Sequence, residues 1–150
     1  MLLGDDRSKS RVPVSELVKE FALRRIGSAV GYGCGAIAEP LHLGVGCRRP
    51  AKVLVLDTDT GTPVAELDSP GDADDIFLDP AQNRVYVSGG EGFARVYARR
   101  EVDHFEVIGD LRTGPGARTS LLAAESQRLY VAVPRRGEAS AEILVFETTK

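Results

Sequence analysis

An Asp-Thr-Gly triplet at Asp59-Thr60-Gly61 is the most suggestive catalytic pattern in this sequence. It follows an apolar stretch, Val53 to Leu56. Two such aspartates, brought together by a dimer, can share a proton and activate water for hydrolysis. A hairpin turn requires Asp and Gly at the same places for its geometry. Because Asp57 and Thr58 stand where a catalytic strand would be apolar, we favour the turn.

A second pattern, Val107-Ile108-Gly109-Asp110, resembles the apolar-apolar-Gly-Asp segment that accompanies Asp-Thr-Gly in retroviral-type aspartic proteases. A hydrolase of this dimeric kind, using Asp59, is therefore the alternative function. No serine or cysteine has a recognisable base within a motif, and we assign no catalytic residue; the chain is more simply read as not an enzyme.

Metal and cofactor patterns are incomplete. Asp57, Asp59 and Gly61 resemble the start of a calcium loop, but glycine stands where a third oxygen ligand is needed. Cys34, His42 and Cys47 are separated by seven and four residues, which matches no familiar zinc spacing. The glycines between residues 31 and 35 follow no predicted strand, so a dinucleotide loop is not indicated. We predict no metal and no cofactor.

Arginine side chains recur in segments that connect predicted strands. Guanidinium groups match the geometry of carboxylate and phosphate, so these arginines are candidates for an anionic ligand. The candidate ligand-binding residues are Arg48, Arg49, Arg118, Arg135 and Arg136. The structural alternative is that Arg118, which aligns with Asp74 at a spacing of 44 residues, pairs with an acidic loop residue of a neighbouring unit.

Short apolar runs alternate with turn residues along most of the chain, which is typical of an all-β meander. Strands are predicted near residues 52–57, 63–68, 74–79, 84–88, 93–98, 105–111, 119–123, 128–133 and 142–147. In a four-stranded antiparallel unit, the loop after the second strand and the loop that enters the unit emerge at one end. All five arginines lie in such loops, together with Asp72, Asp74, Asp75 and Glu91.

The meander repeats with a period near 44 residues. Arg84-Val85-Tyr86-Val87 returns 44 residues later as Arg128-Leu129-Tyr130-Val131, and Leu67 returns as Leu111. Four strands in 40–45 residues are typical of a propeller blade. We therefore predict antiparallel four-stranded β-propeller blades, two to three of them, forming an incomplete propeller.

These repeats resemble the YVTN repeat of bacterial β-propellers, and Asp57-Thr58-Asp59-Thr60-Gly61 is similar to the strand-ending hairpin of that family. The resemblance is to the C-terminal part of YncE-like propellers and covers residues 43–150. It implies a non-catalytic repeat region that serves as a ligand- or partner-binding scaffold, either as part of a propeller or as a truncated remnant of one. Members of this family are usually periplasmic or exported. No residue pattern supports the lactonase or dehydrogenase chemistry of some propellers.

Residues 1–42 differ from the rest, and we predict an irregular or short helical segment, which either covers an open sheet edge or is not native to the blades. Ser15 is placed to cap a helix over residues 16–26. The charge balance, 19 basic and 22 acidic residues for a net charge of −3, argues against a dedicated nucleic-acid binder. No membrane span and no signal peptide are indicated, and the compartment is left open. The sequence does not identify a partner; the candidates are an anionic ligand, other propeller blades or a second copy of the chain.

Overall fold

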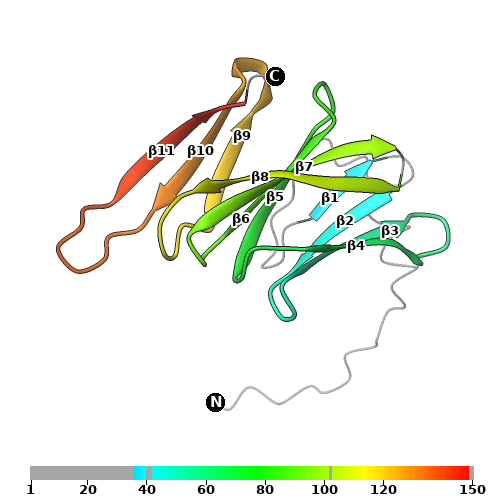
Figure 1. The fold of residues 1–150 in the computed structure, drawn as a ribbon, viewed down its shortest axis with the longest axis horizontal. Coiled ribbons are helices and arrows are strands. Elements are labelled where there is room, and N and C mark those ends of the chain that lie inside the picture. Colours follow the sequence, from blue (N-terminus) through cyan, green and yellow to red (C-terminus); the bar gives the residue numbers. More distant parts are fainter. Residues whose placement is uncertain (1–35, 40–41, 102, 149–150) are drawn as a thin grey trace, which may run out of the picture.

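The computed structural model describes residues 36–39, 42–101 and 103–148, and these form an all-β protein of three antiparallel sheets side by side (Figure 1). Sheet 1 contains β1 (Ala36–Glu39), β2 (His42–Cys47), β3 (Lys52–Asp57) and β4 (Pro63–Asp68). Sheet 2 contains β5 (Ala73–Asp79), β6 (Arg84–Gly89), β7 (Phe93–Glu101) and β8 (His104–Arg112). Sheet 3 contains β9 (Thr119–Ala123), β10 (Arg128–Val133) and β11 (Glu142–Glu147), and a 3-10 turn, η1 (Ala124–Ser126), joins β9 to β10.

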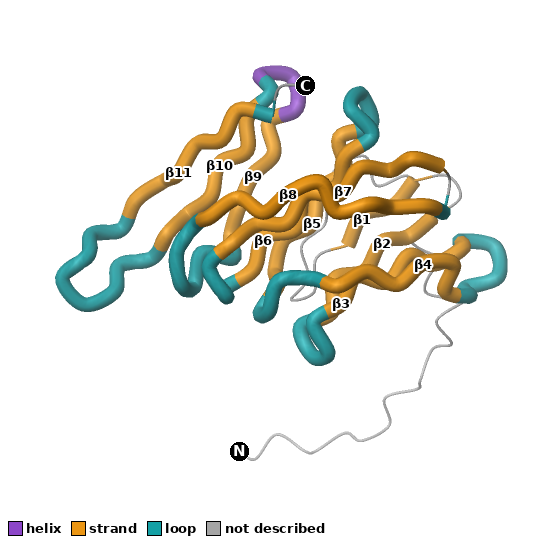
Figure 2. Tube along the Cα trace, in the orientation of Figure 1, coloured by secondary structure: helices purple, strands orange, loops and turns teal. Residues whose placement is uncertain are grey.

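Each sheet is a simple meander in which every strand pairs with the next one along the chain (Figure 2). The nine strands predicted from the sequence are all present, which confirms the all-β fold class. Tyr86 in β6 and Tyr130 in β10 occupy the second strand of adjacent sheets, as the 44-residue period predicts. The first strands also lie near one another, β1 beside β5 and β5 beside β9.

Two apolar layers join the sheets, one on each face of sheet 2. Val85 and Val87 of β6 pack with Val53 of sheet 1, whereas Tyr86 packs with Leu129 and Val131 of sheet 3. Successive side chains of a strand point to opposite faces. Because both faces of sheet 2 are covered, β6 is apolar at consecutive positions and buried along most of its length.

Sheet 1 begins earlier than the sequence indicates. Strand β1 pairs antiparallel with β2, with Glu39 opposite His42 and Ala36 opposite Val45. The boundary predicted at residue 43 therefore falls inside this sheet. The glycines Gly44 and Gly46 do not prevent β2 from pairing with β3. The helix predicted over residues 16–26 lies outside the described residues. Within the described part of the chain, no helix is both long and apolar enough to cross a membrane.

Candidate functional site

The loops at one end of the three sheets are held together by main-chain hydrogen bonds. The amide of Gly90 donates to the carbonyl of Asp72 at 3.1 Å, and the amide of Gly116 donates to the carbonyl of Gly90 at 2.7 Å. We call this the loop end, and it comprises residues 48–51, 69–72, 90–92, 113–118 and 134–141. All five candidate arginines lie there, so the placement expected from the strand order is confirmed.

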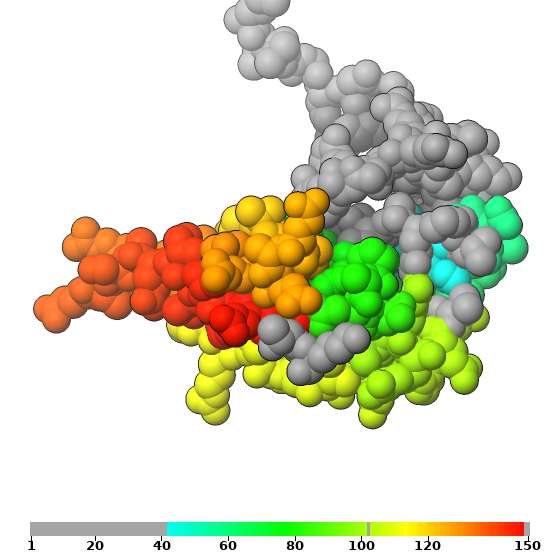
Figure 3. Space-filling model, turned by 90° about the horizontal axis from the view of Figure 1, so that it is seen from above, coloured from blue at the N-terminus to red at the C-terminus, as the bar shows by residue number. Residues whose placement is uncertain are grey.

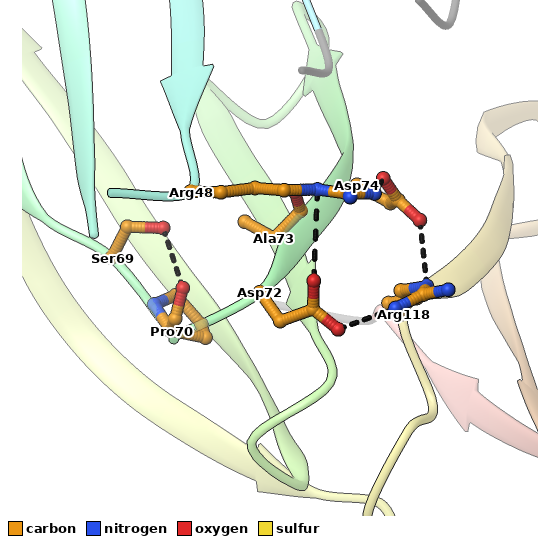
Figure 4. A network of polar contacts seen from close by, with 7 residues as sticks. All are labelled: Arg48, Ser69, Pro70, Asp72, Ala73, Asp74 and Arg118. Atoms are coloured by element: carbon orange, nitrogen blue, oxygen red, sulfur yellow. Dashed lines mark hydrogen bonds and ion pairs between the residues drawn. The ribbon is translucent and has the colours of Figure 1, made fainter. Parts of the chain in front are cut away.

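Two of these arginines form an ion-pair network that spans three sheets (Figure 4). Arg48, after β2, pairs with Asp74 and lies 3.6 Å from a carboxylate oxygen of Asp72, and its Nε donates to the Ala73 carbonyl at 3.3 Å. Arg118, before β9, approaches Asp74 through Nε at 2.9 Å and pairs with Asp72 through Nη1. Asp72, in the loop before β5, and Asp74, in β5, thus bridge an arginine that follows sheet 1 and an arginine that precedes sheet 3.

The electrostatics of the network follow from this geometry. The hydrogen bond from Arg118 holds the pKa of the Asp72 carboxyl below its ordinary value, and the charges of Arg118, Arg48 and Arg49 act in the same direction. Asp72 adopts a left-handed backbone conformation, with φ of 53°, which aspartate tolerates better than most residues. These contacts give Arg48 and Arg118 a structural role, as the alternative for Arg118 predicted.

The other three arginines are exposed, and none has an ion pair among the contacts of the described residues. Arg49 lines an open hollow with Arg48, Gly71 and Asp72. Arg136 lines a second hollow with Arg118, on sheet 3. This second hollow has a volume of about 590 Å³, within the range of small-ligand sites. The sequence therefore placed five arginines correctly at one end, but the structure divides them into a paired group and an unpaired group.

Acidic side chains organise the loop end further. A carboxylate oxygen of Glu91 accepts a hydrogen bond from the Gly71 amide at 2.8 Å. Asp75 of sheet 2 accepts one from the Ser120 amide of sheet 3 at 2.7 Å. The sequence analysis placed Asp74 and Asp75 in a loop with Asp72 and Glu91, whereas in the structure Asp74 and Asp75 lie in β5. The partners of these residues depend on the packing of one sheet against the next, which no local pattern reveals.

The Asp-Thr-Gly segment is a hairpin turn between β3 and β4. The Asp57 carboxylate accepts hydrogen bonds from the amides of Asp59 and Thr60, at 3.1 and 2.7 Å, and from the Thr60 hydroxyl at 2.8 Å. Gly61 has φ of 70°, a conformation that favours glycine. Asp59 is exposed, and Asp110 forms a two-point ion pair with Arg95. Asp57, Gly61 and Asp110 therefore have conformational or pairing roles, and the segment has the geometry of a turn.

Two of the three residues considered above as soft metal ligands are separated in the structure. His42 and Cys47 lie at opposite ends of β2, and Nε2 of His42 is 2.9 Å from a carboxylate oxygen of Asp103. Cys34 lies outside the described residues. Among residues 42–101 and 103–148, no group of three or more His, Cys, Asp or Glu side chains is arranged to hold a metal ion.

No protein-family model matches this chain, and no curated protein matches it at a significant level. Among solved structures, the chain is similar to a Bacteroides uniformis protein described as a "putative 6-phosphogluconolactonase". The TM-score is 0.58 and the sequence identity 17%; the match covers 79% of this chain and 41% of the other. The chain thus spans about two fifths of that protein's length, and the likeness shows a shared fold alone.

Proposed function

We propose that this chain is a run of β-propeller blades that acts as a non-catalytic scaffold and binds an anionic ligand or partner at its loop end. Support for the blade assignment comes from the repeat period, the meander of each sheet and the first strands lying near one another. In a propeller these first strands line the central channel, and the neighbouring loops are a common place for ligands.

The division of the arginines carries the binding proposal. Arg48 and Arg118 are occupied by Asp72 and Asp74, which fixes the loops of three sheets in one arrangement. Arg49, Arg135 and Arg136 project from these loops without an ion pair in the described part of the chain. Guanidinium groups match the geometry of carboxylate and phosphate, and loops whose main chains are already fixed lose less conformational entropy on binding.

Lactone hydrolysis is the second candidate, and a single observation favours it. The Bacteroides uniformis protein is named for a phosphorylated sugar lactone. A phosphorylated sugar acid is an anion that the exposed arginines could receive. We propose binding without turnover, because no serine or cysteine of the sequence has a recognisable base within a motif.

Isothermal titration calorimetry tests the proposal with a nucleoside triphosphate, single-stranded DNA, citrate and 6-phosphogluconate, each at two salt concentrations. We expect heat with at least one of these anions and weaker binding at the higher salt concentration, since exposed charges supply the attraction. Arg135→Ser combined with Arg136→Ser should abolish this heat. Arg128→Ser is the matched control, because Arg128 is also exposed but starts β10 at the opposite end of the sheet.

Three results would contradict the proposal. If folded protein gives no heat with any of the anions, the proposed anion binding is wrong. If Arg128→Ser loses as much binding as the Arg135/Arg136 double variant, the attraction is a general effect of charge and not a property of the loop end. Hydrolysis of 6-phosphogluconolactone above the uncatalysed rate would show that the protein is an enzyme and not a non-catalytic scaffold.

A further inference from the structure

The loop that joins β10 to β11 projects beyond the rest of sheet 3, at the end of the molecule farthest from sheet 1 (Figures 1 and 3). Arg136 stands in this loop, and two main-chain hydrogen bonds with Ala139, of 3.3 and 3.0 Å, close a tight turn. Gly137 in the turn has φ of 56°, a conformation that glycine adopts without strain. The main chain of Arg136 is therefore fixed although its loop is exposed.

The side chain of Arg136 lies against the loop that leads into sheet 3. A Cβ atom added to Gly116 would be 2.9 Å from Nη2 of Arg136 and 3.1 Å from Cγ of Pro134. Because glycine has no side chain, the guanidinium group can lie close to the main chain at this point. The Gly116 amide donates to the carbonyl of Gly90 at 2.7 Å, so the main chain beneath the guanidinium group is anchored to sheet 2.

The hollow that Arg118 and Arg136 line, here called the sheet 3 hollow, contains one unpaired positive charge. Arg118 is already paired with two aspartates, whereas Arg136 has no ion pair among the contacts of the described residues. Two exposed carboxylates lie nearby, Glu142 in the wall of the hollow and Glu138 in the same turn as Arg136. A ligand with several negative charges would be attracted by one guanidinium group and repelled by these carboxylates. The hollow therefore favours a ligand with a single negative charge.

Apolar side chains form much of the wall of the sheet 3 hollow. Val133, Pro134 and Ile143 line it. Ile143 exposes 60% of its surface, so an apolar group that covered it would remove this surface from water. The hollow has a volume of about 590 Å³, which is in the range of small-ligand sites and leaves room for an apolar body beside the charged group.

We propose that the sheet 3 hollow binds a small organic monoanion. Its carboxylate is held by Arg136, and its apolar body packs against Val133, Pro134 and Ile143. This inference rests on the proposed function, because it names the class of anion bound at the loop end. A planar guanidinium group can donate two parallel hydrogen bonds to a carboxylate, which fixes the orientation of the ligand. Polyanions bind the hollow more weakly than a monoanion that carries an apolar body.

An NMR titration of the full chain with acetate, hexanoate and citrate tests the inference. Acetate and hexanoate carry the same charge and differ only in the length of the alkyl chain, so the comparison isolates the apolar contribution. We expect hexanoate to bind at least about tenfold more tightly than acetate, which is the effect of burying roughly two methylene groups. Citrate should bind more weakly than hexanoate, because the carboxylates beside Arg136 repel its additional charges.

Matched variants locate the bound monoanion. Arg136→Gln should weaken hexanoate binding by at least about tenfold, because it removes a charged hydrogen-bond donor. Arg135→Gln is its control, since Arg135 is exposed in the same loop but is not among the described residues that line the hollow. Ile143→Ser should weaken the binding of hexanoate and leave that of acetate unchanged. Its control is Val145→Ser, because Val145 is 51% exposed on the same strand but lies outside the lining. Circular dichroism checks that each variant keeps the wild-type fold.

Glu142→Gln tests the selectivity and should strengthen the binding of citrate more than that of hexanoate. Equal affinity for acetate and hexanoate overturns the inference, as does wild-type protein that binds citrate more tightly than hexanoate. Full hexanoate binding by Arg136→Gln or Ile143→Ser, or equal losses in their controls, also overturns it. Each of these results leaves anion binding at the loop end intact. If folded protein binds none of these carboxylates and none of the anions used in calorimetry, the proposed function fails as well.

Discussion

The hydroxyl group of Tyr97 in β7 donates a hydrogen bond to the main-chain carbonyl of Asp68, where β4 of the neighbouring sheet ends. Burial raises the pKa of this hydroxyl group, so it stays protonated and able to donate. We expect Tyr97→Phe to lower the free energy of unfolding by about 1 kcal/mol, because it removes a buried hydrogen bond between two sheets. Urea unfolding followed by circular dichroism measures this change.

Tyr86 provides the control for Tyr97. It is about as deeply buried, but its hydroxyl group has no hydrogen-bond partner among the residues that the structure describes. Because an unsatisfied buried hydroxyl group costs free energy, Tyr86→Phe should be neutral or stabilise by up to about 1 kcal/mol. Equal destabilisation by both substitutions would show that the Tyr97–Asp68 contact does not contribute as argued.

Asp75 and Asp72 should respond to pH in opposite directions. Burial raises the pKa of the Asp75 carboxyl, so its ionised form costs stability at neutral pH, and that cost is relieved as the pH falls through the folded-state value. Asp75→Asn should therefore stabilise at neutral pH, since an amide oxygen can still accept from Ser120. The difference in the free energy of unfolding between Asp75→Asn and the wild type should shrink in acid.

For Asp72 the sign reverses. The hydrogen bond from Arg118 lowers the pKa of the Asp72 carboxyl. The ionised carboxylate therefore stabilises the fold at pH values above its unfolded-state pKa, and this stabilisation is lost as the pH falls through its folded-state pKa. Asp72→Asn should destabilise at neutral pH and approach the wild type in acid. Unfolding curves in urea from neutral pH down to pH of about 3 separate the two cases, and identical pH profiles for both variants would contradict this assignment.

Gly89 at the end of β6 admits no side chain. A Cβ atom there would lie 2.4 Å from Cβ of Pro70 and 2.7 Å from the Gly71 carbonyl oxygen, in the loop that enters sheet 2. Gly89→Ala should cost about 1–3 kcal/mol, as overpacking does elsewhere. Gly109→Ala in β8 is the control, because a Cβ atom would meet nothing within 4 Å. Thermal unfolding that is unchanged for both variants would show that the loop moves aside without cost.

The strands could be predicted from the sequence because apolar runs and turn residues act locally. The turn at Asp57 to Gly61 is an example, since its hydrogen bonds join residues no more than a few positions apart. The repeat also places Tyr86 and Tyr130 correctly. Strands β1 and β2 are not among the predicted strands. Ala36–Glu39 carries neither the repeat pattern nor a strong β-forming run, and Gly44 and Gly46 weaken the pattern of β2. The pairing of β1 with β2 and of β2 with β3 supplies what local preference does not.

The candidate site was predictable in its location but not in its pairing. Strand order alone puts Arg48 and Arg118 at the loop end. Their shared partners, Asp72 and Asp74, depend on how three sheets pack, with 46 residues separating Arg118 from Asp72. Such distant contacts follow from tertiary structure, so the sequence could not separate the paired arginines from the unpaired ones.

The turn at Asp57 to Gly61 distinguishes the scaffold from the dimeric hydrolase. If Asp59 is only a turn residue, Asp59→Asn should change the free energy of unfolding by less than about 1 kcal/mol, because asparagine also suits such turns and the side chain is exposed. Asp57→Ala should destabilise more than Asp59→Asn, since the Asp57 carboxylate accepts three hydrogen bonds. The hydrolase predicts a different result: pepstatin-sensitive peptide cleavage by the wild type that Asp59→Asn abolishes. We expect no such cleavage, and finding it would overturn the scaffold assignment whatever the two variants do to stability.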